Sequence, residues 1–129
     1  MLVLTLAALY GTTAGCAWKR QAQQKREDAY QLALRSYSET LKPGMTRKEV
    51  EDYLHAKNIS FGQLCCIDER GAYADLFKTG KESHPWYCEQ HNVYIAFQFA
   101  AVKPRDALKA DDSDMLKRVT IFHKLDGCL

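Results

Sequence analysis

The sequence predicts an α+β domain with two N-terminal helices packed on one face of a three- or four-stranded antiparallel sheet, preceded by an apolar N-terminal signal or anchor. Apolar residues recur at helical spacing in the first half of the chain and alternate at strand spacing in the second half. Pro43 and Gly44 separate the two predicted helices. The 129 residues, 47% hydrophobic and 26% charged, predict segment 1–18 as the signal or anchor and 19–129 as a single domain.

The N-terminal segment contains an apolar run, Leu2–Ala17, followed by a basic, polar stretch, Trp18–Arg26. This order is typical of a signal peptide or of an uncleaved membrane anchor, and a helix buried in the domain is the remaining alternative. Residues 13–16, Thr-Ala-Gly-Cys, resemble a bacterial lipobox, which implies a lipoprotein signal with Cys16 as the lipidated residue. The run has no basic residues before it, and a truncated start would explain that.

The first helix is predicted over Arg20–Leu41, because this stretch lacks proline and glycine and carries an apolar stripe at helical spacing. Its early part, Gln21–Asp28, has no such stripe and is predicted to space the domain from the membrane. The stripe consists of Tyr30, Ala33, Leu34, Tyr37 and Leu41.

The second helix begins after Thr46, where Thr46 and Glu49 form a predicted capping box, and it ends near Lys57 and Asn58. Its apolar face carries Val50, Tyr53 and Leu54. Its solvent face is predicted to hold Arg47, Lys48, Glu51 and Asp52, with a weak pairing of Glu51 with Arg47 or Lys48.

Strands are predicted over Ser60–Asp68, Asn92–Ala101 and Leu116–Leu125. In the second of these the apolar side chains fall on one face, and they are Val93, Ile95, Phe97 and Phe99. Tyr73–Lys78 predicts either a further strand or a short helix. Long loops over 69–91 and 102–115 connect these elements, and long loops in small domains often carry function.

One stretch resembles a known family. Residues 43–54 resemble the helix signature Gly-Met-Ser/Thr-x-x-Glu/Gln-Val of the SmpA/OmlA family, and the matching residues are Pro43, Gly44, Met45, Thr46, Glu49, Val50 and Leu54. Members of that family are small lipoproteins of the bacterial outer-membrane β-barrel assembly machine, and β-lactamase inhibitor proteins have a similar fold. The resemblance implies a small envelope domain that binds or scaffolds other proteins, and it assigns no functional residue. The four cysteines beyond Cys16 and the long 69–91 connection depart from the family pattern.

Those four cysteines predict two disulfides in an exported domain, and they are Cys65, Cys66, Cys88 and Cys128. A bond between Cys65 and Cys66 is disfavoured, because neighbouring side chains on a strand point to opposite faces. We therefore expect one of the two to bond Cys88 and the other Cys128, in an order that the sequence does not decide. The alternative is a zinc or thiol-redox domain that uses Cys65, Cys66, Cys88 and His91.

The remaining features favour a non-enzymatic role. The formal net charge of +2 and the scattered basic residues give no nucleic-acid-binding surface. The histidines are scattered, with His55 expected to be exposed and His123 to be partly buried and hydrogen-bonded; no catalytic group, metal or cofactor is assigned. The acidic residues Asp111, Asp112 and Asp114 predict a solvated turn.

Trp86 and Tyr87 follow Pro85 in the long loop beside Cys88, and they predict either an interface or a cap on the sheet. Together these features predict a membrane-tethered, periplasmic protein-binding or scaffolding domain of the cell envelope. Its expected partners are the membrane, through the N-terminal segment, and another envelope protein.

Overall fold

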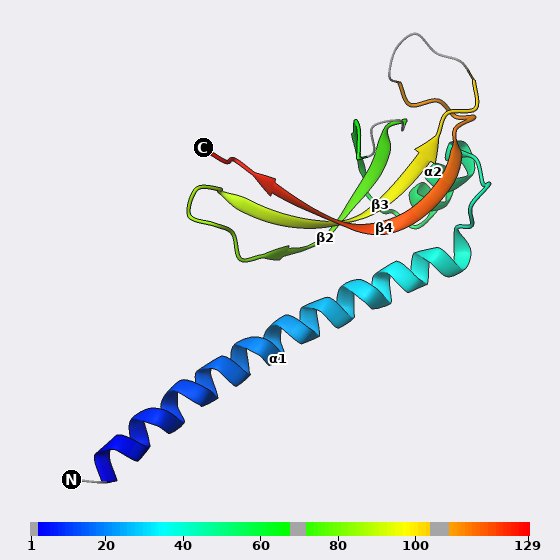
Figure 1. Cartoon of the computed structure of the whole chain (residues 1–129). Helices are drawn as coiled ribbons and strands as arrows, with labels where there is room; N and C mark the ends of the chain where they lie inside the picture. The colour runs from blue at the N-terminus through cyan, green and yellow to red at the C-terminus, as the bar shows by residue number, and fades with distance from the viewer. Residues whose placement is uncertain (1–2, 68–71, 104–108) are drawn as a thin grey trace. The chain divides into compact units, whose positions relative to one another are not determined.

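The computed structural model describes the backbone of residues 3–67, 72–103 and 109–129, and the side chains in these ranges from residue 14 onward. In these ranges the chain forms two helices, α1 (Val3–Thr40) and α2 (Arg47–Ala56), followed by four strands (Figure 1). The strands are β1 (Gly62–Leu64), β2 (Ala74–Glu82), β3 (Gln90–Ala100) and β4 (Met115–Asp126). They form one antiparallel sheet in the order β1-β2-β3-β4. The predicted α+β class is confirmed.

The chain divides into two compact units, Met1–Leu32 and Ala33–Leu129. The first unit belongs to α1, which continues without a break through Cys16. The side chains of residues 1–13, which carry most of the predicted signal or anchor, lie outside the described part of the chain. Among the residues that the structure describes, no helix has the length and apolar character that crossing a membrane requires.

In the second unit, the last two turns of α1 pack on the core as the apolar stripe predicted. Ala33, Leu34 and Tyr37 lie against the buried cluster, and Leu41 is buried within it. The Tyr37 ring makes edge contacts with Phe77 and Phe97, at 6.0 and 5.6 Å between ring centroids.

The start of α2 has the predicted capping box. Thr46 Oγ1 accepts a hydrogen bond from the Glu49 backbone N–H at 3.2 Å, and the Thr46 N–H donates to Glu49 Oε2 at 2.8 Å. Val50 and Leu54 are fully buried, and Asn58 ends the helical region with a φ of 56°. The prediction for Arg47 is wrong, because its side chain is only 1% exposed.

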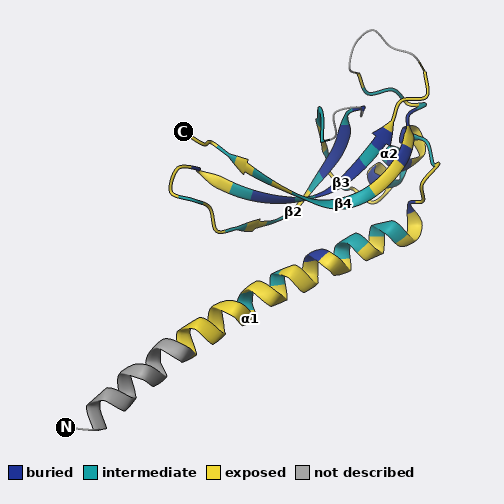
Figure 2. Cartoon of the chain, in the orientation of Figure 1, coloured by how far each residue is buried: buried dark blue, intermediate teal, exposed yellow. Residues whose placement is uncertain are grey.

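The sheet contains the three predicted strands, and it includes a fourth strand where the sequence left a strand and a short helix as alternatives. Of the segment Tyr73–Lys78, all but Tyr73 belongs to strand β2 rather than to a short helix, and β2 runs on to Glu82. Strand β1 is only three residues long, so Cys65 and Cys66 lie beyond its end rather than within it. Burial is concentrated on β2, β3 and α2 (Figure 2).

The main core lies between the sheet and α2. The predicted apolar face of β3 is buried in full. Between Gln98 and Phe99 the register shifts, since β4 advances from Arg118 to Leu116 while β3 advances by one residue. This bulge turns Leu116 to the same face as Phe99 and lets it join the core. The buried members of the core are Leu41, Val50, Leu54, Ala72, Ile95, Phe97, Phe99 and Leu116.

Candidate functional site

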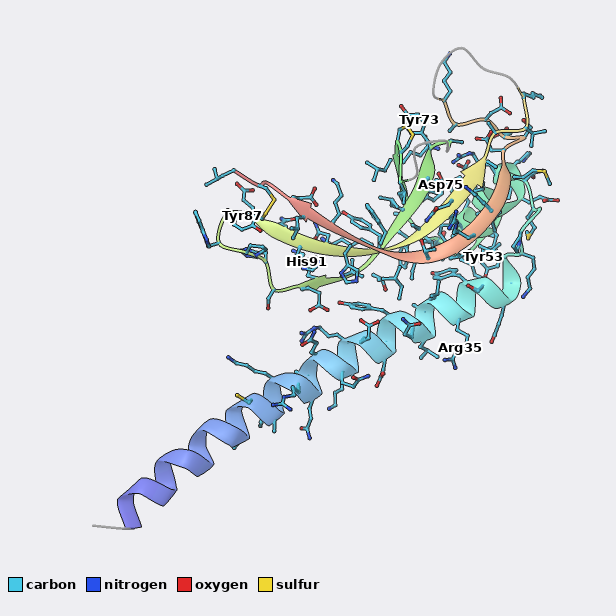
Figure 3. The ribbon with its side chains drawn as sticks, in the orientation of Figure 1. Arg35, Tyr53, Tyr73, Asp75, Tyr87 and His91 are labelled. Carbon is cyan, nitrogen blue, oxygen red and sulfur yellow. A yellow bond between two sulfur atoms is a disulfide. The ribbon has the colours of Figure 1, made fainter. Side chains whose placement is uncertain are left out.

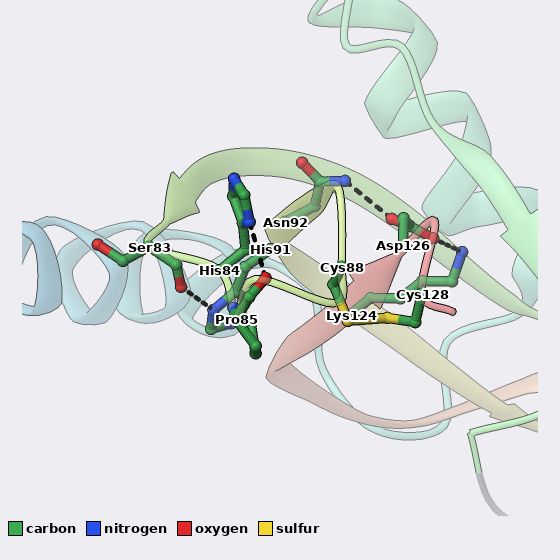
Figure 4. Close-up of a disulfide and its surroundings, with 9 residues drawn as sticks. All are labelled: Ser83, His84, Pro85, Cys88, His91, Asn92, Lys124, Asp126 and Cys128. Atoms are coloured by element: carbon green, nitrogen blue, oxygen red, sulfur yellow. Dashed lines mark hydrogen bonds and ion pairs between the residues drawn. A yellow bond between two sulfur atoms is a disulfide. The ribbon is translucent and has the colours of Figure 1, made fainter.

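The loop between β2 and β3 is tied to the C-terminal residues by a disulfide between Cys88 and Cys128 (Figure 4). Two backbone bonds reinforce it. The Glu89 N–H donates to Asp126 O at 3.0 Å, and the Leu129 N–H donates to Tyr87 O at 2.8 Å. The loop therefore enters β3 in a fixed conformation.

The predicted disulfide pairing is wrong. Cys88 bonds Cys128, and Cys65 bonds Cys66 across a cis peptide bond. The pairing of Gln90 with Asp126 in the β3–β4 hairpin places residue 88 opposite residue 128 when the register is extended. The objection to a bond between neighbours assumed a strand, but β1 ends at Leu64. The two alternating segments indicate a β3–β4 hairpin, and a correct guess of its register, extended to residues 88 and 128, was the signal that could have identified the Cys88–Cys128 bond.

The two predicted interface residues are displayed by this loop. The Trp86 side chain is 87% exposed and that of Tyr87 is 43% exposed, whereas Cys88 behind them is buried. Their rings meet edge to face, with centroids 5.7 Å apart. Trp86 therefore does not cap the sheet, which was the alternative to an interface.

Two histidines face each other beside this loop. His91 Nε2 lies 2.9 Å from His123 Nδ1. On its other side, His91 Nδ1 lies 3.1 Å from the Ser83 carbonyl oxygen (Figure 4). The prediction of a hydrogen bond for His123 is confirmed, but its side chain is exposed rather than partly buried. His55 is exposed, as predicted.

On the opposite face of the same hairpin, Asp126 is held by two donors. Asn92 Nδ2 donates to Asp126 Oδ2 at 2.8 Å, and Lys124 Nζ donates to Oδ1 at 2.5 Å. The hydrogen bond from Lys124, followed by that from Asn92, holds the pKa of Asp126 below its usual range. These contacts join the ends of β3 and β4 near the disulfide.

A second cluster lies at the other end of β2 and β3, where Asp75 and Tyr73 are found (Figure 3). The buried Arg47 guanidinium binds Asp75 Oδ1 through Nη1 at 2.9 Å and Asp114 Oδ2 through Nε at 3.1 Å. It also donates to the Tyr73 carbonyl oxygen, and it lies 4.0 Å above the centre of the Phe99 ring. The Arg47 backbone N–H donates to Asp114 O at 2.7 Å.

This cluster corrects two predictions. Arg47 does not face solvent, and Asp114 is fully buried rather than part of a solvated turn. Carboxyl groups from two distant segments, Asp75 and Asp114, surround the guanidinium, and their charge and hydrogen bonds permit its burial. The predicted pairing of Arg47 with Glu51 is present as a contact of 3.7 Å.

Asp75 is the unusual member of the cluster. Burial, with a smaller contribution from the neighbouring Glu51, raises its pKa to about 7 against the opposing effect of Arg47. Its Oδ2 atom is buried and has no hydrogen-bond partner among the described residues. The cluster joins α2, β2 and the 111–114 turn, which is a structural role.

The ligand set of the zinc alternative is not assembled in the structure. Cys65, Cys66 and Cys88 are all in disulfides, and a disulfide sulfur is not a thiolate ligand. In the described ranges, no group of three or more histidine, cysteine or acidic side chains is arranged to hold a metal ion.

Comparisons with protein-family models, with curated proteins and with solved structures found no match to this chain. The resemblance to the SmpA/OmlA family therefore stays a prediction.

Proposed function

We propose that this chain is a non-enzymatic domain of the bacterial cell envelope that binds or scaffolds another envelope protein. The observation that carries the proposal is Trp86, a large aromatic side chain 87% exposed on a loop that is covalently fixed. Tyr87 adds a second exposed ring beside it. Exposed, rigid aromatic residues are the side chains that most often dominate the binding energy of protein interfaces.

The fixed loop supports this role energetically. Binding costs free energy when mobile loops and side chains become ordered. Here the Cys88–Cys128 disulfide and the bond between the Leu129 N–H and Tyr87 O hold the backbone before any partner arrives. An interface built on this loop avoids part of that ordering cost.

The proposed location is extracytoplasmic, with the domain tethered to a membrane through its N-terminal segment. Support comes from the apolar run, from the lipobox-like residues ending at Cys16, and from the two disulfides, which persist in oxidising compartments. Cys16 is exposed and bonded to no other cysteine among the described residues. Lipidation at Cys16 and a periplasmic domain belong to this proposal.

A photo-crosslinking amino acid placed at position 86 tests the proposal in the native cell. We expect one abundant adduct with an envelope protein, identified by mass spectrometry. The same amino acid at position 57, where Lys57 is exposed at the end of α2, is the matched control and should give no such adduct.

The identified partner is then purified and its affinity is measured for the unmodified chain and for Trp86→Ala. Loss of a central aromatic anchor costs about 2 kcal/mol or more, which is roughly thirtyfold in affinity. Equal adducts at positions 86 and 57, or an unchanged affinity for Trp86→Ala, would contradict the proposed surface.

A further inference from the structure

We propose that His91 and His123 form a surface site for a divalent transition-metal ion, with Cu²⁺ and Ni²⁺ preferred over Zn²⁺. The two side chains share a sheet face, since His123 pairs with Val93 and His91 pairs with Leu125 in the β3–β4 register. This places them diagonally across neighbouring strands, with His91 Nε2 2.9 Å from His123 Nδ1. The inference does not rest on the proposed protein-binding role.

The Ser83 carbonyl group orients the first ligand. A carbonyl oxygen accepts but cannot donate, so His91 Nδ1 carries the proton in the contact of 3.1 Å. In the neutral imidazole, His91 Nε2 then holds a lone pair directed at His123. A histidine that donates one ring N–H to a backbone carbonyl and ligates through the other nitrogen is the usual arrangement at protein metal sites.

The second ligand needs a change of tautomer and a rotation of both exposed rings, because the rings point at each other with centroids 5.1 Å apart and their lone pairs must turn to converge on one ion. In the hydrogen bond between the rings, His123 Nδ1 donates to His91 Nε2. When the His123 proton moves to Nε2 by exchange with water, both facing nitrogens carry lone pairs, and no net proton is released. The His123 side chain is exposed, so this exchange is open to solvent.

The nitrogen separation favours particular metals once both rings have turned so that their lone pairs converge on one point. Two nitrogens 2.9 Å apart subtend about 90° at an ion bound at roughly 2.0–2.1 Å from each. Square-planar and octahedral ions use this angle, whereas the tetrahedral geometry of Zn²⁺ needs the nitrogens to move apart to about 3.4 Å. Cu²⁺ also binds nitrogen ligands most tightly in the divalent series. Water completes the coordination, which leaves positions open to an external ligand.

The scaffold holds the pair in place. The Cys88–Cys128 disulfide and the bond between the Glu89 N–H and Asp126 O fix the two strand ends beside the histidines. The hydrogen bonds from Asn92 and Lys124 to Asp126 fix the opposite face of the same hairpin. The backbone positions of the two histidines are therefore fixed before the ion binds, which limits the entropy lost on binding.

The test uses the full chain without an affinity tag, with Cys16→Ser so that its thiol does not compete, after removal of bound metal with a chelator. Titration with Cu²⁺ is followed by calorimetry and by electron paramagnetic resonance. We expect saturable binding of a single ion, with a spectrum that reports two imidazole nitrogens, and weaker binding of Ni²⁺ and Zn²⁺.

Single substitutions His91→Ala and His123→Ala should each weaken Cu²⁺ binding by about tenfold or more and remove one nitrogen from the spectrum. His55→Ala is the matched control, since His55 is exposed on α2, and it should bind Cu²⁺ like the parent chain. Circular dichroism of each variant confirms that it is folded. A parent spectrum without imidazole nitrogens, or equal affinity in all three variants, would overturn the assignment.

Discussion

Arg47 and Asp75 form a buried ion pair in which Nη1 and Oδ1 lie 2.9 Å apart, with side chains 1% and 0% exposed. The two residues are 28 positions apart in the sequence, one at the start of α2 and the other near the start of β2. The guanidinium binds Asp114 on its other side. A single cation therefore compensates two buried carboxyl groups and links three segments of the domain.

Replacing this cation should destabilise the domain strongly. Arg47→Met keeps much of the side-chain volume but removes the cation and the hydrogen bonds that compensate Asp114 and the ionised fraction of Asp75, and both carboxyl groups stay buried. We expect a loss of about 3–5 kcal/mol in the free energy of unfolding, measured by urea denaturation at neutral pH. Lys48→Met is the matched control, because the neighbouring Lys48–Asp52 pair is exposed on both sides, and it should leave the midpoint nearly unchanged. Similar midpoints for the two variants would contradict the ion-cluster account.

The contribution of Asp75 to stability should also fall as pH rises from about 4 to about 7. The pKa of Asp75 is raised from 3.8 to about 7, so between these values the folded chain keeps a proton that the unfolded chain has released. The folded state binds more protons there, which makes the free energy of unfolding decrease by up to about 1.4 kcal/mol per pH unit. The decrease ends above pH 7, where both states have lost the proton.

Asp75→Asn isolates this effect, because asparagine has a similar shape and does not titrate. We expect the difference in unfolding free energy between the parent chain and the variant to change with pH over this range and to become constant above it. A difference that stays constant from pH 4 to 7 would show that Asp75 has an ordinary pKa in the folded chain.

The elements that the sequence predicted are those with local signals. The capping box of Thr46 and Glu49 requires only four consecutive residues, and the buried face of β3 follows from strict alternation of apolar side chains. Arg47 was misplaced because helical patterning assigns a charged residue to solvent. Its burial depends on carboxylates at positions 75 and 114, which no local pattern connects to α2.

The same distinction between local signals and long-range contacts explains which parts of the candidate sites were predicted and which were missed. Trp86 and Tyr87 were predicted as an interface from their own side chains and from the adjacent Cys88. The contact between His91 and His123 was missed, since it depends on the register of the β3–β4 hairpin across 32 positions. That register also sets the Cys88–Cys128 bond, so one unassigned pairing accounts for both omissions.

The N-cap of α2 offers a smaller, independent prediction. Thr46→Ala removes the oxygen that accepts the Glu49 N–H, and we expect a loss of about 1 kcal/mol in the free energy of unfolding. Thr46→Ser keeps the hydroxyl and should stay close to the parent chain in the same urea titration. If serine destabilises as much as alanine does, the cap contributes less than the threonine methyl group.

The two disulfides should differ sharply in their contribution to stability. A cross-link stabilises mainly by restricting the unfolded chain, and this effect grows with the length of the closed loop. Cys88 and Cys128 are 40 positions apart, which predicts about 4 kcal/mol, whereas Cys65 and Cys66 are adjacent and close almost no loop. The double variants Cys88→Ser/Cys128→Ser and Cys65→Ser/Cys66→Ser, compared by urea denaturation, test this directly.

If the protein bonded each of Cys65 and Cys66 to one of the distant cysteines instead, either double variant would break both long-range bonds. Both variants would then lose stability to a similar degree, and the alkylation of two freed thiols in each, detected by intact mass, would identify that pairing.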